Sequence, residues 1–235
     1  MKLTERHVEE LYKFSRKHFV YHFDVQSELV DHLANDIENI WKEQPKLSFE
    51  DARDVSFKKF GVFGFMDVIE AKQKQMSKRY RKIMWRFFSE WFTMPKLVTT
   101  TTIFLIAFLI LKRTYSEYIF LGVLLLLVVI DLTKQTISRK KEKKKAKKQE
   151  KVFLLESMIG AARNGFSGLI FVNIFNTINA FKVSFNGMET HWQLLVAFSF
   201  TVVIILFYVT GYLIPQKAEA LLTETYPEYK LSKIL

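Results

Sequence analysis

The sequence contains no cysteine among its 235 residues. A disulfide framework, a thiolate nucleophile and a Cys-based zinc site are therefore excluded. The chain also lacks the phosphate-binding patterns G-x-x-x-x-G-K-[ST] and G-x-G-x-x-G, the metalloprotease pattern H-E-x-x-H and the hydrolase pattern G-x-S-x-G. We therefore name no catalytic, cofactor-binding or metal-ligating residue, and we predict a protein that is not an enzyme.

The first residues, MKLTERHVEELYKF, are charged and contain no apolar run of the kind that a secretory signal requires. We expect the N-terminus to stay in the cytoplasm. The hydrophobic fraction is 49% although 25% of the residues are charged, which indicates separate apolar and charged blocks.

A basic run divides the sequence at residues 139–151, where nine of thirteen residues are Lys or Arg and two are Glu. Apolar stretches lie on both sides of it. Lys and Arg stay on the cytoplasmic side because moving them across a bilayer is costly, and they attract anionic lipid headgroups. We predict a cytoplasmic loop that sets membrane topology, with a solvated linker and a nucleic-acid patch as alternatives. Its basic residues are Arg139, Lys140, Lys141, Lys143, Lys144, Lys145, Lys147, Lys148 and Lys151.

The net charge of +11 comes mainly from this run and from residues 77–96, so it follows the predicted membrane edges. No direct nucleic-acid partner is needed to explain it.

Residues 1–76 predict a small helical domain. Thr4, Asp24 and Ser48 are placed to cap three helices, and Gly61 can end the third in a left-handed conformation. The second helix carries one apolar stripe, formed by Leu29, Leu33, Ile37, Ile40 and Trp41.

Three short runs in this domain, at residues 28–33 (ELVDHL), 48–52 (SFEDA) and 59–61 (KFG), resemble the HAAS family of small helical signalling domains. The resemblance covers about residues 10–75. It implies a domain on the cytoplasmic side, ahead of several membrane helices, with a sensing or relay role. Such domains are often found with PadR-type transcription regulators, which implies a soluble regulator as the partner.

The second helix also carries a polar surface on which we expect the partner to dock. Its residues are Glu28, Asp31, His32 and Asp36. The pairs His18/His22 and Glu28/His32 have the four-residue spacing of helical metal sites. The first pair straddles the predicted end of a helix and the second is consistent with a surface pair, so we do not favour metal binding for either.

The rest of the chain predicts a membrane region. Residues 77–93 form an amphipathic juxtamembrane helix with a basic face opposite an aromatic face. Residues 94–132 form a first transmembrane hairpin, 133–151 the basic loop, 152–214 an interfacial segment with a second hairpin, and 215–235 a cytoplasmic tail. We expect spans near 94–111, 115–132, 164–181 and 192–214. The predicted fold class is all-α: a small cytoplasmic helical domain plus a four-helix transmembrane bundle.

The third predicted span carries small and polar residues. Ala161, Gly165 and Gly168 would let helix backbones approach closely. Asn173, Asn176 and Thr177 need polar partners, either from neighbouring helices or from water in a substrate path. Asp131 and Arg163 lie at the same membrane edge, and we predict an ion pair between them.

We therefore expect a multi-pass protein of a bacterial cytoplasmic membrane, with both termini in the cytoplasm and a regulatory, sensing or scaffolding role. It would contact anionic lipid and a soluble protein partner. Two alternatives stay open: an accessory subunit of a larger membrane complex, and a small transporter or channel. A homodimer formed through the third span is also consistent with the sequence.

Overall fold

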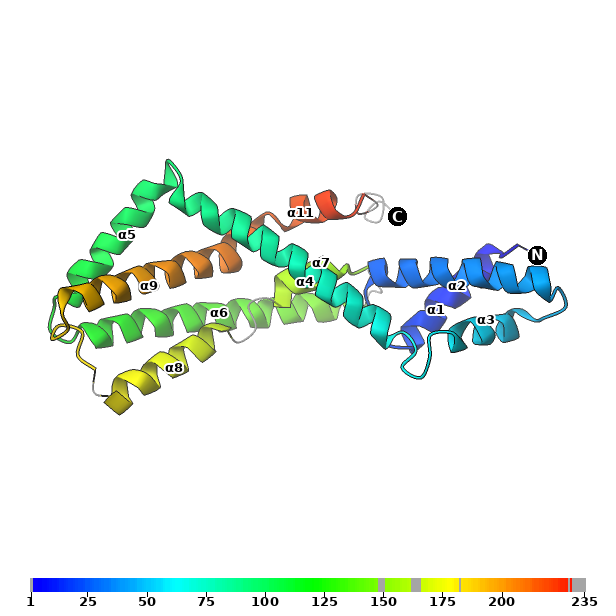
Figure 1. Cartoon of the computed structure of the whole chain (residues 1–235), viewed down its shortest axis with the longest axis horizontal. Helices are drawn as coiled ribbons and strands as arrows, with labels where there is room; N and C mark the ends of the chain where they lie inside the picture. Colours follow the sequence, from blue (N-terminus) through cyan, green and yellow to red (C-terminus); the bar gives the residue numbers. More distant parts are fainter. Residues whose placement is uncertain (1, 148–150, 162–165, 182, 228, 230–235) are drawn as a thin grey trace. The chain divides into compact units, whose positions relative to one another are not determined.

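The computed structural model describes residues 2–147, 151–161, 166–181, 183–227 and 229. The secondary structure in these ranges is helical throughout and includes no strand (Figure 1). The all-α prediction is therefore confirmed. The chain folds as two compact units: unit 1 holds Met1–Arg79 and Glu150–Ser157, and unit 2 holds Tyr80–Gln149 and Met158–Leu235.

Unit 1 is built from α1 (Glu5–Lys17), α2 (Phe23–Glu43), α3 (Phe49–Lys58) and the first part of α4 (Met66–Ser89). The Thr4 hydroxyl accepts the backbone N–H of His7, and the Ser48 hydroxyl accepts that of Asp51, so both predicted caps are confirmed. Gly61 takes the predicted left-handed conformation, with φ of +77°. The predicted stripe of α2 is buried along its whole length.

The start of α2 differs from the prediction. The helix begins at Phe23, and His22 occupies the capping position without a side-chain hydrogen bond to the helix. The Asp24 carboxylate instead accepts the backbone N–H of Leu154, at 3.0 Å. Asp24 therefore caps a helix from the other half of the sequence and does not occupy the N-cap position of α2.

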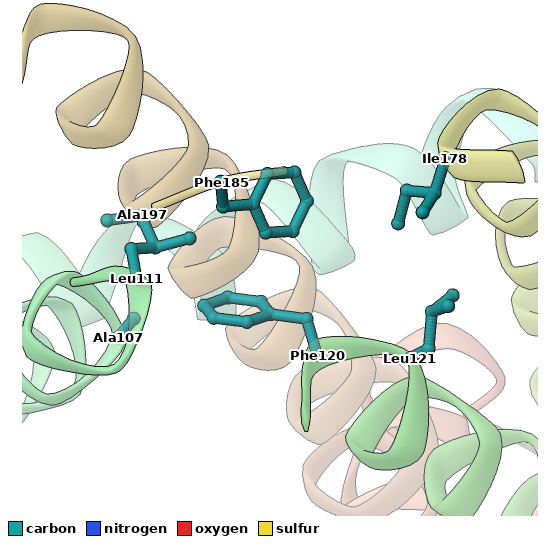
Figure 2. Packing of buried hydrophobic residues seen from close by; sticks show 7 residues of the cluster. All are labelled: Ala107, Leu111, Phe120, Leu121, Ile178, Phe185 and Ala197. Atoms are coloured by element: carbon teal, nitrogen blue, oxygen red, sulfur yellow. The ribbon is translucent and has the colours of Figure 1, made fainter. Parts of the chain in front are cut away.

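Unit 2 contains α5 (Lys96–Leu111), α6 (Ser116–Lys147), α8 (Phe166–Phe181) and α9 (Thr190–Tyr208). α5 packs along α9, and α6 packs along α8. Figure 2 shows the apolar cluster that joins the ends of these helices and the loop before α9. Its buried members are Ala107, Leu111, Phe120, Leu121, Ile178, Phe185 and Ala197.

Two helical segments are long and apolar enough to cross a membrane: Ser116–Lys140, with 25 residues, and Thr190–Gln216, with 27. A third candidate is the pair Met66–Phe92 and Lys96–Leu111, which bends by 79°. The described part of the chain therefore has two to three candidate spans, against four predicted. α8 has 16 residues, or about 24 Å at 1.5 Å per residue, which is shorter than a hydrocarbon core of about 30 Å.

The basic run also differs from the predicted loop, because α6 continues as one helix to Lys147. Lys, Arg, Glu, Ala and Gln are all good helix formers, and the run contains no Gly or Pro to end the helix. Lys148 lies outside the described residues. For Lys141, Lys145 and Lys147 the structure describes the backbone alone.

The remaining elements are short. They are η1 (Glu90–Phe92), α7 (Leu154–Ala161), which crosses the boundary between the units, the π-turn η2 (Val209–Leu213), α10 (Ile214–Gln216) and α11 (Ala218–Thr225). In unit 2, the segment around α11 packs on the second half of α4. The Lys217 ammonium lies 5.0 Å from the ring centre of Phe87, and Glu224 pairs with Arg86 at 3.7 Å.

Candidate protein-docking site

Unit 1 contains a short segment from the middle of the chain, residues 151–157, docked at the start of α2. The backbone N–H of Phe23 donates to the carbonyl of Val152 at 2.8 Å. The N–H of Leu154, the first residue of α7, donates to the Asp24 carboxylate. These two bonds hold the segment in register against α2, and Asp24 acts as a cap for a second helix.

Side chains complete the contact. Phe153 and Leu155 are fully buried, and Leu154 is nearly so. The Phe153 ring meets the edge of the Phe23 ring at 5.6 Å, and Phe23 stacks on Tyr12 at 6.0 Å. We name residues 152–155 the VFLL segment. It packs against the first turn of α2, at Phe23 and Asp24.

Two titratable groups border the VFLL segment. The Lys151 ammonium lies 4.6 Å from the centre of the Phe23 ring, within the range of a cation–π interaction. Burial lowers the pKa of His22 below its ordinary value of 6.5, and the nearby Asp24 carboxylate offsets only part of this effect. His22 is therefore held in its neutral form beside the docked segment.

The predicted docking residues on α2 have two different environments. Glu28 pairs with Lys72 of α4, and Asp36 pairs with Lys59 at 2.7 Å. Burial alone would raise the pKa of Asp36, but hydrogen bonding and the charge of Lys59 outweigh it, so the pKa is lowered.

Asp31 and His32 are exposed. Asp24, Glu28 and Asp31 follow one another at intervals of four and three residues, so they share one face of α2. We name these three residues the acidic face of α2. The VFLL segment contacts this face at Asp24.

The predicted histidine pairs have ordinary structural surroundings. The His18 Nδ1 is 2.9 Å from the carbonyl of Phe14, and the His18 ring packs against Phe57 and Phe65. Among the residues that the structure describes, no group of three or more His, Cys, Asp or Glu side chains could hold a metal ion.

The predicted amphipathic helix at 77–93 corresponds to the second half of α4 with η1. Tyr80, Ile83 and Phe87 form a buried stripe. Trp85 is 65% exposed and lies on the same side as Lys78 and Lys82, and its ring contacts that of Phe88 at 5.5 Å, so the basic and aromatic faces adjoin at Trp85. This basic face with a central Trp has the composition of a headgroup-contacting surface.

The polar residues of the third predicted span lie on the outward side of α8. Ile178 is buried against α6, whereas Asn173, Asn176 and Thr177 are exposed. The Asn173 amide donates to the carbonyl of Leu169, and the Thr177 hydroxyl donates to that of Asn173, each at 2.8 Å. The helix itself thus satisfies part of this patch.

Several predicted residues are not fully described. Gly165 and Arg163 lie outside the described residues, and at Ala161 and Gly168 the structure describes only the helical backbone. Asp131 is buried in α6. The Asp131–Arg163 ion pair and the close-packed face of small residues therefore stay predictions.

A polar contact inside unit 2 was missed by sequence reasoning. Pro215 has no N–H, so the carbonyl of Gly211, four residues earlier, loses its usual helical donor. The Lys134 ammonium of α6 donates to this carbonyl at 3.4 Å, and it lies 5.6 Å from the Tyr212 ring. The sequence signal is the Pro near the end of an apolar helix; nothing local identifies Lys134 as the donor.

The chain has no match among protein-family models, curated proteins or solved structures. The resemblance of residues 28–33, 48–52 and 59–61 to the HAAS family therefore stays a prediction, and the function is argued from the contacts above.

Proposed function

We propose that this chain is a non-enzymatic, multi-pass protein of a bacterial cytoplasmic membrane that acts as a regulator or scaffold. Unit 1 docks a cytoplasmic protein partner, both termini are cytoplasmic, and the apolar helices form a transmembrane bundle of up to four spans. α4 and the basic run contact anionic lipid headgroups.

One observation carries this proposal: residues 151–157, which follow the apolar helix α6 in the chain, fold as part of unit 1. Unit 1 is therefore joined to the apolar helices by three chain connections: α4, the stretch between Lys147 and Lys151, and α7. A single connection would hold unit 1 near a membrane, whereas several connections let a change in the separation of α4 and α6 act on unit 1 itself. Such coupling supports a relay or a scaffold.

The test is affinity purification of the tagged full chain from its own membranes, with identification of the proteins that accompany it. The variant Asp31→Arg reverses an exposed charge on the acidic face of α2, and Glu9→Arg reverses an exposed charge on α1 as a matched control. We expect a soluble regulator to accompany the wild type and Glu9→Arg but to be depleted with Asp31→Arg. If no soluble protein depends on unit 1, the docking proposal is wrong.

The accessory-subunit alternative is favoured by the outward Asn face of α8. Asn173 and Asn176 are exposed on a helix that packs on α6 through its other side. Interhelical hydrogen bonds from such residues contribute to association in lipid, here with another subunit or a second copy of this chain. Integral membrane proteins recovered in fixed ratio, and lost with Asn173→Leu/Asn176→Leu, would support this function.

The transporter or channel alternative has less support. It requires the Asn patch to line a path between helices of the same bundle, whereas these side chains lie on the outward side of α8.

A further inference from the structure

We propose that the site filled by the VFLL segment is the peptide-docking site of unit 1, and that the partner takes it over by displacing this segment. The partner would present a basic residue, then an aromatic and two aliphatic residues, at the beginning of a helix. This inference rests on the proposed docking role of unit 1.

The contacts that hold the VFLL segment can be supplied by another chain. The carbonyl of Val152 and the N–H of Leu154 are backbone groups, which any peptide in the same conformation presents. Docking through main-chain bonds gives affinity without demanding a particular sequence. The Phe23 N–H and the Asp24 carboxylate therefore form a general docking point for a peptide at the start of α2.

The side chains define which peptides fit. The Phe153 ring packs against Phe23, and the neighbouring aliphatic side chains of Leu154 and Leu155 are also buried. A cation two residues before the aromatic residue lies over the Phe23 ring, where Lys151 lies now. Asp24 accepts an N–H from the first residue of α7, so the site favours a peptide that begins a helix there.

The acidic face extends this selection. Asp31 is exposed on the same face of α2 as Asp24, so a partner with further basic residues gains complementary charge there. The chain's own segment has such a neighbourhood, because the basic run directly precedes it. The VFLL segment thus competes from within the same chain, and it has the residue types that we expect in the partner's peptide.

The VFLL segment competes with the partner for the same site, and this competition lowers the partner's apparent affinity. A segment tethered in the same chain has an effective concentration of roughly millimolar order. A free ligand binds only the fraction of molecules in which the site is open, and its apparent affinity falls by that fraction. We expect this closure to weaken binding by a factor of at least about ten.

The direct test uses a fluorescent peptide with the chain's own residues 147–160, KKQEKVFLLESMIG, and the full chain in detergent micelles. Fluorescence anisotropy is expected to show binding at least about tenfold tighter to Phe153→Ala/Leu155→Ala than to the wild type, because the cis segment no longer competes. Adding Asp24→Ala to that variant should weaken binding again. The control Phe175→Ala/Leu195→Ala changes exposed residues of the same types in unit 2 and should bind as the wild type does.

Equal binding by the wild type and a folded Phe153→Ala/Leu155→Ala chain overturns the proposal. Hydrogen exchange of the wild type gives a test that needs no variant. The amides of Phe23 and Leu154 should exchange together, and faster than the amides of Leu29 and Leu33 in the interior of α2. Equal protection of all four amides would mean that the VFLL segment is permanent core, and this also overturns the proposal.

The proposed docking function and the proposed displacement of the VFLL segment can be refuted independently. If the peptide binds as expected but no soluble protein co-purifies, the site stands and the relay function fails. If a soluble partner co-purifies through Asp31 but opening the VFLL site does not increase peptide binding, the partner docks elsewhere on unit 1 and the inference is wrong.

Discussion

Lys134→Met should destabilise unit 2 by leaving the carbonyl of Gly211 without its donor. Gly211 is buried, and Pro215 cannot supply the helical N–H. An unsatisfied buried acceptor costs about 1–3 kcal/mol. The contact is long, at 3.4 Å, and Lys134 is only partly buried, so the lower end of that range applies. For a unit of this size, about 1 kcal/mol corresponds to a fall in Tm of roughly 2–4 °C.

The assay is thermal unfolding of the full chain in detergent micelles, followed by circular dichroism at 222 nm. Lys140→Met removes an exposed Lys from the same helix and should leave Tm nearly unchanged. Met keeps most of the length and apolar contact of Lys, so the comparison isolates the ammonium group.

The variant Pro215→Ala distinguishes the two contributions of Lys134, its hydrogen bond to the Gly211 carbonyl and its cation–π contact with Tyr212. The alanine introduced there would donate its backbone N–H to the carbonyl of Gly211. Lys134→Met should therefore cost less in the Pro215→Ala background, by a coupling energy of about 1 kcal/mol. Loss of the cation–π contact with Tyr212 would be the same in both backgrounds. An equal loss of Tm with and without Pro215 would refute the account of Gly211.

Three further results are expected. Because burial lowers the pKa of His22, neutral His22 stabilises unit 1 at neutral pH. That stability should be lost as the pH falls below about 6.5 towards the native pKa, a loss that His22→Gln should reduce when thermal unfolding is compared at pH 7.5 and 5.5. Leu33→Ala empties a fully buried position of α2 and should cost about 2–5 kcal/mol in denaturant unfolding, whereas Val62→Ala, at a position 99% exposed, should change it by less than about 0.5 kcal/mol. Because the chain has no Cys, a fluorophore on Trp85→Cys reports one position. It should be quenched by spin-labelled headgroups in anionic vesicles, and quenching no stronger than at Val62→Cys would argue against a headgroup-contacting face of α4.

Local signals account for the parts of unit 1 that the sequence predicted. Caps such as Thr4 and Ser48 act within one helical turn, and the stripe of α2 depends on a fixed period of 3.6 residues. Such features can be read from a short stretch of sequence. They do not depend on where the rest of the chain goes.

The VFLL segment shows why the candidate site could not be predicted. Its composition, apolar residues after a basic run, is also that of an interfacial membrane helix, which is what the sequence indicated. The contact with Asp24 crosses 130 residues, and no periodicity within the segment encodes its partner. The same holds for Lys134, whose role depends on a carbonyl 77 residues away.

Because α6 continues as a helix into the basic run, the helix geometry determines how its charges interact with an anionic membrane surface. Successive residues of an α-helix turn by about 100°, so the positions of Arg139, Lys140, Lys141, Lys143, Lys144, Lys145 and Lys147 cover about two thirds of the circumference, and Glu142 and Ala146 occupy the remaining third. This part of α6 therefore has a basic side, and its energy beside an anionic surface changes when the helix rotates. A shift along the axis by one turn, about 5.4 Å, also changes how many charges lie within a Debye length of about 8–10 Å. The electrostatic energy of α6 would therefore depend both on its depth in the membrane and on its rotation about its own axis.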